Sequence, residues 1–280
     1  MGKPKKIARF REYMRTIMMA MKENKSTTIV YFVLRFAVIA VMILQILNGN
    51  YENVFLCILT LVLFIVPSFI ELKFKVYLPS TLEIIILLFI FAAEILGEIH
   101  DYYYTYQYWD TILHTINGFL AAAVGYSLVD LLNKSDRVKF ELSPIFMAIV
   151  AFSFSMTIGV LWEFFEFGMD QFFGMNTQKD TILTSVPYLP TGPNGERETI
   201  ENITSVVVNG IPLTVEGYVD IGLIDTMYDL IVNFVGAFIF SVFGFFYAKG
   251  YITGKFIKRF IPRKRPEEMD YLNGGTLDEE

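Results

Sequence analysis

The sequence predicts an all-α fold, a polytopic bundle of six transmembrane helices with a small β-hairpin in one long loop. Hydrophobic residues make up 54% of the 280-residue chain, and aromatic residues make up 16%. The apolar residues fall in blocks about twenty residues long, the length at which a helix crosses a bilayer core of about 30 Å. Basic and acidic residues are segregated along the chain, so the net charge of −6 describes no single surface. These features indicate an integral membrane protein.

Residues 1–27 carry eight Lys and Arg residues but only Glu12 and Glu23 as acids. Apolar residues recur between them at helical spacing, a pattern typical of a basic amphipathic helix lying on an anionic membrane surface. A signal peptide does not fit, because the next apolar run is about twenty residues long and lacks a small-residue cleavage pattern. We therefore expect residues 1–27 to form a retained interfacial helix.

Six spans are predicted in a transmembrane domain of residues 28–249, and their loops differ in basic content. The N-terminal segment, the 72–80 and 133–143 loops and the C-terminal segment 250–280 are rich in Lys and Arg, whereas the 48–52 and 99–109 loops have none. Cytoplasmic loops collect basic residues, so both termini are predicted to be cytoplasmic. The predicted spans are approximately 28–48, 52–71, 81–98, 110–132, 144–167 and 226–248.

The segment 171–221 is the only stretch long enough to fold outside the membrane. Within it, Ile203–Val208 and Ile211–Val215 flank Asn209-Gly210, a dipeptide that favours a two-residue hairpin turn. The preceding part is rich in proline and glycine, which indicates turns. The sequence predicts a small β-hairpin lid over the extracytoplasmic face.

Polar side chains recur at the predicted extracytoplasmic ends of the last three spans. Residues three or four apart share one face of a helix, so each group should present its side chains together. Carboxylates inside a span are costly and usually face a partner, a cavity or a metal. The candidate site residues are Asp110 and His114 on the fourth span, Glu163 and Glu166 on the fifth, and Asp225 and Asp229 on the sixth.

So many carboxylates cannot all be ionised in one low-dielectric pocket without a counter-charge, and three outcomes are open. A divalent metal such as Zn, Mn or Mg could neutralise them, with His114, Glu163, Glu166, Asp225 and Asp229 as ligands. Some carboxylates could instead be protonated and act as acid and base. They could also only hold the helices together by hydrogen bonds.

Four motifs in this order resemble the bacterial YjdF-type integral membrane proteins, a family without an established activity: Trp109–His114, Gly159–Glu166, Asn176–Gln178 and Gly222–Asp229. The resemblance covers about residues 80–248 and implies a bacterial cytoplasmic (plasma) membrane location. It marks Gln178 in addition to the six candidates. Two features depart from the family: Asn233 stands where many relatives carry an acid, and residues 179–221 form a longer insertion than usual. More distantly, the pattern is similar to the VanZ-like membrane proteins, which are associated with glycopeptide-antibiotic resistance.

The leading hypothesis is a metal- or acid/base-dependent membrane enzyme that acts on a lipid or cell-envelope substrate from the extracytoplasmic side. In it, Asp110 and Asp225 orient or ligate, His114 is ligand or base, and Glu163, Glu166 and Asp229 complete the set. A proton- or cation-coupled transporter is the alternative, although the cytoplasmic halves of the spans are almost wholly apolar. A structural or partner-binding role needs no site. We expect the lipid bilayer as a partner and no nucleic acid, since basic residues cluster only at the chain ends and cytoplasmic loops.

Overall fold

The computed structural model describes residues 25–74, 76–133, 142–188, 198–252 and 259–264. These residues form two compact units: residues 1–155 with 233–280 belong to unit 1, and residues 156–232 form unit 2. The boundaries fall inside two helices, α8 (Pro144–Phe173) and α9 (Leu223–Ala248). The predicted interfacial helix lies outside the described residues except for its last few, as does most of the predicted C-terminal tail, so this division into domains stays a prediction.

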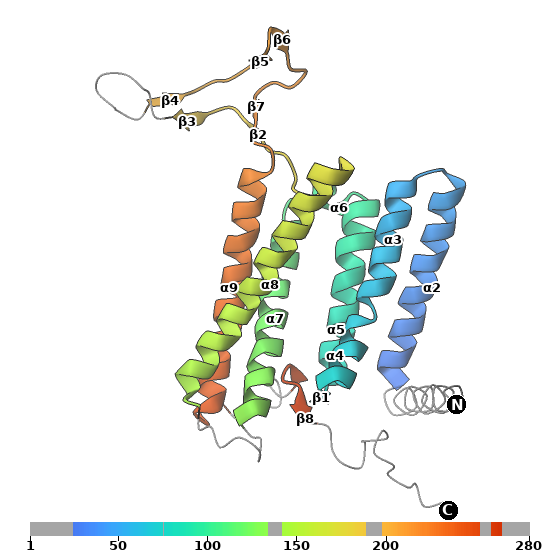
Figure 1. The fold of residues 1–280 in the computed structure, drawn as a ribbon, viewed down its shortest axis with the longest axis vertical. Helices are drawn as coiled ribbons and strands as arrows, with labels where there is room; N and C mark the ends of the chain where they lie inside the picture. The colour runs from blue at the N-terminus through green and yellow to red at the C-terminus, as the bar shows by residue number, and fades with distance from the viewer. Residues whose placement is uncertain (1–24, 75, 134–141, 189–197, 253–258, 265–280) are drawn as a thin grey trace, which may run out of the picture. The chain divides into compact units, whose positions relative to one another are not determined.

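Unit 1 is helical (Figure 1). Beyond its parts of α8 and α9, its elements are α2 (Lys25–Leu47), α3 (Tyr51–Leu63), α4 (Val66–Phe74), α5 (Ser80–Phe91), the π-helix η1 (Ala92–Ile99), α6 (Tyr102–Thr105) and α7 (Trp109–Asn133). A two-residue antiparallel pair joins β1 (Val76–Tyr77) to β8 (Arg263–Lys264), with Val76 opposite Lys264.

The turn between α2 and α3 follows from its residues. Gly49 has a φ of +73°, a conformation that glycine adopts without the cost a side chain would bring. Asn50 then caps α3, because its Oδ1 accepts a hydrogen bond from the backbone N–H of Asn53 at 3.1 Å. The two helices pack against each other and against α5, and Leu34, Val38, Cys57, Phe64 and Leu87 lie in the shared apolar core.

In unit 1, α7 and α9 approach until their backbones touch. A Cβ atom on Gly118 would lie 2.1 Å from the Asn233 carbonyl oxygen, and one on Gly236 would lie 2.0 Å from the Thr115 carbonyl oxygen. Membrane helices use small residues in this way to gain close packing. Beside this contact, the Asn117 side chain donates a hydrogen bond to Asn233 Oδ1 at 3.2 Å.

Five helices are long and apolar enough to cross a membrane: Lys25–Leu47, Tyr51–Glu71, Trp109–Asn133, Pro144–Phe173 and Leu223–Ala248. They correspond to five of the six predicted spans, which confirms the helical membrane bundle. The predicted third span, residues 81–98, is helical but divided between α5 and η1. Six as the number of spans therefore stays a prediction.

Unit 2 consists of the C-terminal part of α8, the N-terminal part of α9 and the segment between them (Figure 1). The predicted hairpin is present: β5 (Val207–Val208) pairs with β6 (Ile211–Pro212), and both Asn209 and Gly210 have positive φ. The strands are shorter than predicted. Two further antiparallel pairs precede and enclose it, β3 (Val186–Tyr188) with β4 (Glu198–Ile200), and β2 (Ile182–Leu183) with β7 (Tyr218–Val219).

Candidate functional site

Unit 2 contains a compact cluster of three carboxylates. Glu163 and Glu166 lie about one turn apart on α8, and Asp229 lies on α9. One carboxylate oxygen of each residue lies within 4.8 Å of those of the other two. Glu163 is 5% exposed and Asp229 is 3% exposed, while Glu166 is half-buried. Within this unit, the predicted convergence of α8 and α9 carboxylates is therefore observed.

The two oxygens of Glu166 have different surroundings. Oε1 accepts a hydrogen bond from the indole Nε1–H of Trp162 at 3.0 Å, and the Trp162 ring packs against Phe165. Oε2 is shielded from solvent, and no hydrogen-bond donor reaches it from the part of the chain that the structure describes. A buried carboxylate oxygen without a donor is costly, and a proton or a bound cation would remove that cost.

Asp170, one turn beyond Glu166 on α8, anchors the chain that follows the helix. Its Oδ1 accepts from the backbone N–H of Thr177 at 2.6 Å, and its Oδ2 accepts from the N–H of Gln178 at 2.9 Å. Thr177 Oγ1 also lies 2.9 Å from the Glu166 carbonyl oxygen. These bonds fold the segment after α8 back onto the last turns of the helix, next to the residue that carries the cluster's Oε2.

Asp225 and Gln178 have comparable anchoring contacts on α9. Asp225 Oδ2 accepts from the backbone N–H of Lys179 at 2.8 Å, and Gln178 Nε2 donates to Thr226 Oγ1 at 2.6 Å. Neither residue belongs to the carboxylate cluster. The structure thus gives Asp225 a positional contact, and the metal-ligand role assigned to it from sequence stays a prediction.

Asp220 connects the innermost strand pair to the start of α9. One carboxylate oxygen accepts from the N–H of Thr181 and the other from the N–H of Ile224, each at 2.8 Å. Sequence reasoning missed Asp220, Thr177 and Thr226. For Asp220 a signal existed, because an aspartate a few residues before an apolar helix is typical of an N-terminal cap.

The acidic groups at this anchor affect one another. The pKa of Asp180 is raised, first by partial burial and then by the negative charges of Asp220 and Asp170. Like charges disfavour the ionised form of a carboxyl group. Negative potential is therefore concentrated beside the segment that closes the end of unit 2.

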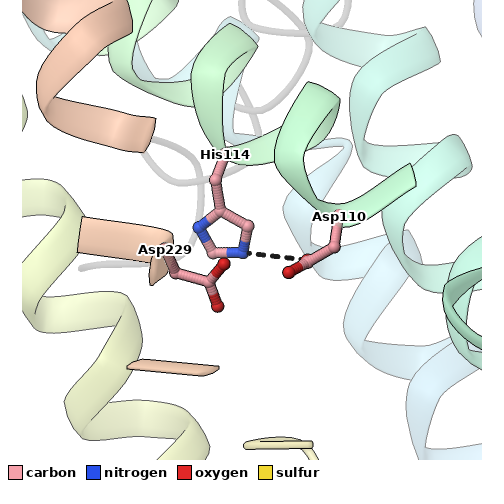
Figure 2. A group of neighbouring side chains, drawn as sticks. All are labelled: Asp110, His114 and Asp229. Atoms are coloured by element: carbon pink, nitrogen blue, oxygen red, sulfur yellow. Dashed lines mark ion pairs between the residues drawn. The ribbon is translucent and has the colours of Figure 1, made fainter. Parts of the chain in front are cut away.

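Asp110 and His114 form a pair on α7 in unit 1 (Figure 2). The spacing of four residues brings His114 Nε2 to 3.4 Å from Asp110 Oδ1, and the side chains are 12% and 29% exposed. A carboxylate beside one ring nitrogen fixes the orientation of the imidazole and raises its basicity as a ligand or base. The predicted i,i+4 pairing is confirmed, but the role of the pair stays a prediction.

Asn233 and Glu94 were also part of the predicted polar set. Asn233 is 1% exposed and bonded to Asn117, so its described contact is an interhelical one in unit 1. Glu94 is 3% exposed on the π-helix η1 and belongs to neither group of candidate metal ligands among the described residues.

Comparison with known proteins fits a helical protein with apolar spans and buried carboxylates. The family model described as "Predicted membrane protein (DUF2238)" matches residues 29–250, and the chain belongs to this family. An uncharacterized protein of Thermotoga maritima is 29% identical over 110 residues, which cover 38% of this chain and 55% of the relative. The match thus spans about half of that relative. No solved structure matches the chain.

These findings confirm the expected class, a membrane protein family of unknown function. The more distant likeness to VanZ-like proteins stays a prediction, as do the bacterial plasma membrane location and the cytoplasmic placement of both termini.

Proposed function

We propose that Glu163, Glu166 and Asp229 hold a divalent cation in a membrane enzyme that acts on a lipid or cell-envelope substrate. The observation that carries this proposal is the approach of three carboxylate oxygens to within 4.8 Å in a largely buried setting. Two negative charges about 5 Å apart repel by about 3 kcal/mol at an effective dielectric constant of 20. Three ionised groups at this spacing need a cation, or they must share protons.

The chemistry of the ligands narrows the choice of metal. All three donors in unit 2 are carboxylate oxygens, which suit Mg²⁺ and Mn²⁺ better than Zn²⁺. The predicted participation of His114 would favour Zn²⁺ or Mn²⁺ instead, because imidazole is a ligand for those metals. The identity of the metal that binds most tightly therefore tests whether His114 belongs to the ligand set.

The surrounding residues would keep these carboxylates in place. The Trp162 indole fixes Glu166 through Oε1 and leaves Oε2 directed to other partners. The bonds from Asp170 and Asp225 close the following segment over the ends of α8 and α9. A bound divalent cation would polarise a substrate carbonyl or phosphoryl oxygen or lower the pKa of a bound water. The carboxylate not needed as a ligand would accept the proton released.

The test uses the full chain purified in detergent, stripped with chelator and dialysed against Mn²⁺, Mg²⁺ or Zn²⁺. We expect close to one metal per chain, and a Tm that rises with metal concentration as ligand linkage requires. Glu166→Gln and Asp229→Asn should lower the metal content and abolish the rise in Tm. The matched control is Glu52→Gln, an exposed acid at the start of α3 that should leave both unchanged.

Two results would contradict the metal. One is wild-type protein without metal whose Tm is insensitive to all three ions. The other is metal binding that Glu166→Gln, Asp229→Asn and Glu52→Gln affect equally. A Tm that ignores metal but depends on pH in the wild type, and not in Glu166→Gln, would instead identify the cluster as a proton-binding site.

A further inference from the structure

An apolar groove runs between the N-terminal part of α8 and the C-terminal part of α9, within unit 1. Its volume is about 340 Å³. Ala148 and Ser241, both 6% exposed, contribute small side chains to its lining, where larger residues would fill the space. The lining is otherwise apolar: Ile145, Ile149, Phe152, Phe238, Val242, Phe245 and Phe246.

One end of the groove carries a positive charge. Lys249 follows the last residue of α9, and its Nζ lies 4.8 Å from the ring centroid of Phe245, which lines the groove. Because α9 is a candidate membrane span of 26 residues, its end falls at the level of the lipid headgroups. A lysine at that level attracts anionic lipid headgroups.

We propose that this groove binds an acyl chain of an anionic glycerophospholipid, whose phosphate group lies beside Lys249. From Phe238 to Phe245 the groove extends about 10 Å along α9 at 1.5 Å per residue. It thus accommodates the part of an acyl chain nearest the headgroup. Bulk lipid is as apolar as the lining, so apolar contact alone gives little preference. The selectivity comes from Lys249, and it does not depend on the carboxylate cluster of unit 2.

Native mass spectrometry of the full chain in detergent tests this proposal, with palmitoyl-oleoyl phosphatidylglycerol and phosphatidylcholine added in equal amounts. We expect about a fivefold preference for phosphatidylglycerol, the equilibrium equivalent of one basic residue near an anionic surface. Lys249→Gln should abolish the preference. Lys25→Gln, an exposed lysine at the start of α2, should retain it.

Two variants that fill the groove test the position of the acyl chain. Ala148→Phe should remove the bound phosphatidylglycerol, and Val242→Trp should do the same from a more exposed wall, where added volume strains the fold less. Val33→Trp places the same bulk on an exposed position of α2 and should have no effect.

The proposal is overturned if wild-type protein retains both lipids equally, or if Lys249→Gln and Lys25→Gln lose the same amount. It is also overturned if Val242→Trp folds with wild-type Tm and keeps its phosphatidylglycerol. A shift from dimer to monomer in the groove variants, with lipid binding unchanged, would show that a second copy of the chain covers the groove.

Discussion

Replacing Gly118 by alanine should force α7 and α9 apart, because the new methyl group would meet backbone and not a movable side chain. Its Cβ would lie 2.1 Å from the Asn233 carbonyl oxygen, and atoms of this kind essentially never come closer than 3.0 Å. The difference, 3.0 minus 2.1, requires a displacement of at least about 0.9 Å along that direction. The same displacement lengthens the Asn117–Asn233 hydrogen bond, which is already 3.2 Å.

The expected cost is a balance of two effects. Overpacking a close contact costs about 1–3 kcal/mol, and rigid backbone atoms place Gly118→Ala in the upper part of that range. Alanine regains about 1 kcal/mol of helix propensity over glycine. We therefore expect a net loss of about 1–2 kcal/mol in the free energy of unfolding. Gly236→Ala should cost a similar amount, because its Cβ would lie 2.0 Å from the Thr115 carbonyl oxygen.

The two substitutions should not be additive. The separation of α7 and α9 that accommodates one methyl group also makes room for the other, so the double variant should cost at least about 0.5 kcal/mol less than the sum. Reversible unfolding in mixed micelles with increasing SDS, followed by tryptophan fluorescence, measures all three variants.

Gly168→Ala is the matched control, because no atom lies within 4 Å of the position that its methyl group would occupy on α8. It should be neutral or stabilising by up to about 1 kcal/mol. The reasoning fails if Gly118→Ala and Gly168→Ala shift stability equally in the same direction, or if the costs of Gly118→Ala and Gly236→Ala add in full.

Three further predictions concern polar contacts. Asn117→Leu removes a donor to the buried amide of Asn233 and should cost about 1–2 kcal/mol in the same unfolding assay, whereas wild-type stability would contradict the bond. Asp220→Ala removes the acceptor of two backbone N–H groups and should cost about 1–2 kcal/mol locally, seen as faster amide exchange of both; unchanged exchange would refute the anchor. The pKa of Asp180 is raised in the folded state, so its stabilising contribution is complete below the unfolded pKa and is lost as pH rises through the folded pKa. Asp180→Asn should therefore raise Tm relative to wild type at neutral pH and not at low pH, in a pH series of thermal unfolding; an equal gain at all pH values would contradict this.

The features that were predicted well are those set by local spacing. Asn209-Gly210 produces a tight turn because both positions adopt positive φ at little cost, so the β5–β6 hairpin could be predicted without knowledge of its surroundings. The pairing of Asp110 with His114 likewise depends only on the pitch of one helix.

Other features depend on residues that are distant in the chain. No local pattern indicates that Asp225 contacts the backbone of Lys179, because a carboxylate can accept an N–H as readily as it can ligate a metal. The two extra strand pairs β2–β7 and β3–β4 are only two or three residues long and have no alternating pattern to reveal them. Trp162 could have been assigned to packing alone, whereas its indole nitrogen donates to Glu166.

The π-helix η1 has a consequence for insertions and deletions in this chain. A π-turn holds one residue more than an α-turn between its bonded groups, so the eight residues Ala92–Ile99 store surplus length inside an otherwise regular helix. Deleting one of them would allow a return to α-helical bonding. The aromatic segment that follows would then rotate by about 100° around the helix axis, the angle between successive residues at 3.6 per turn. The alignment of Tyr103 against Gly97, and with it the docking of the segment, is thus fixed by how many residues this wide turn contains.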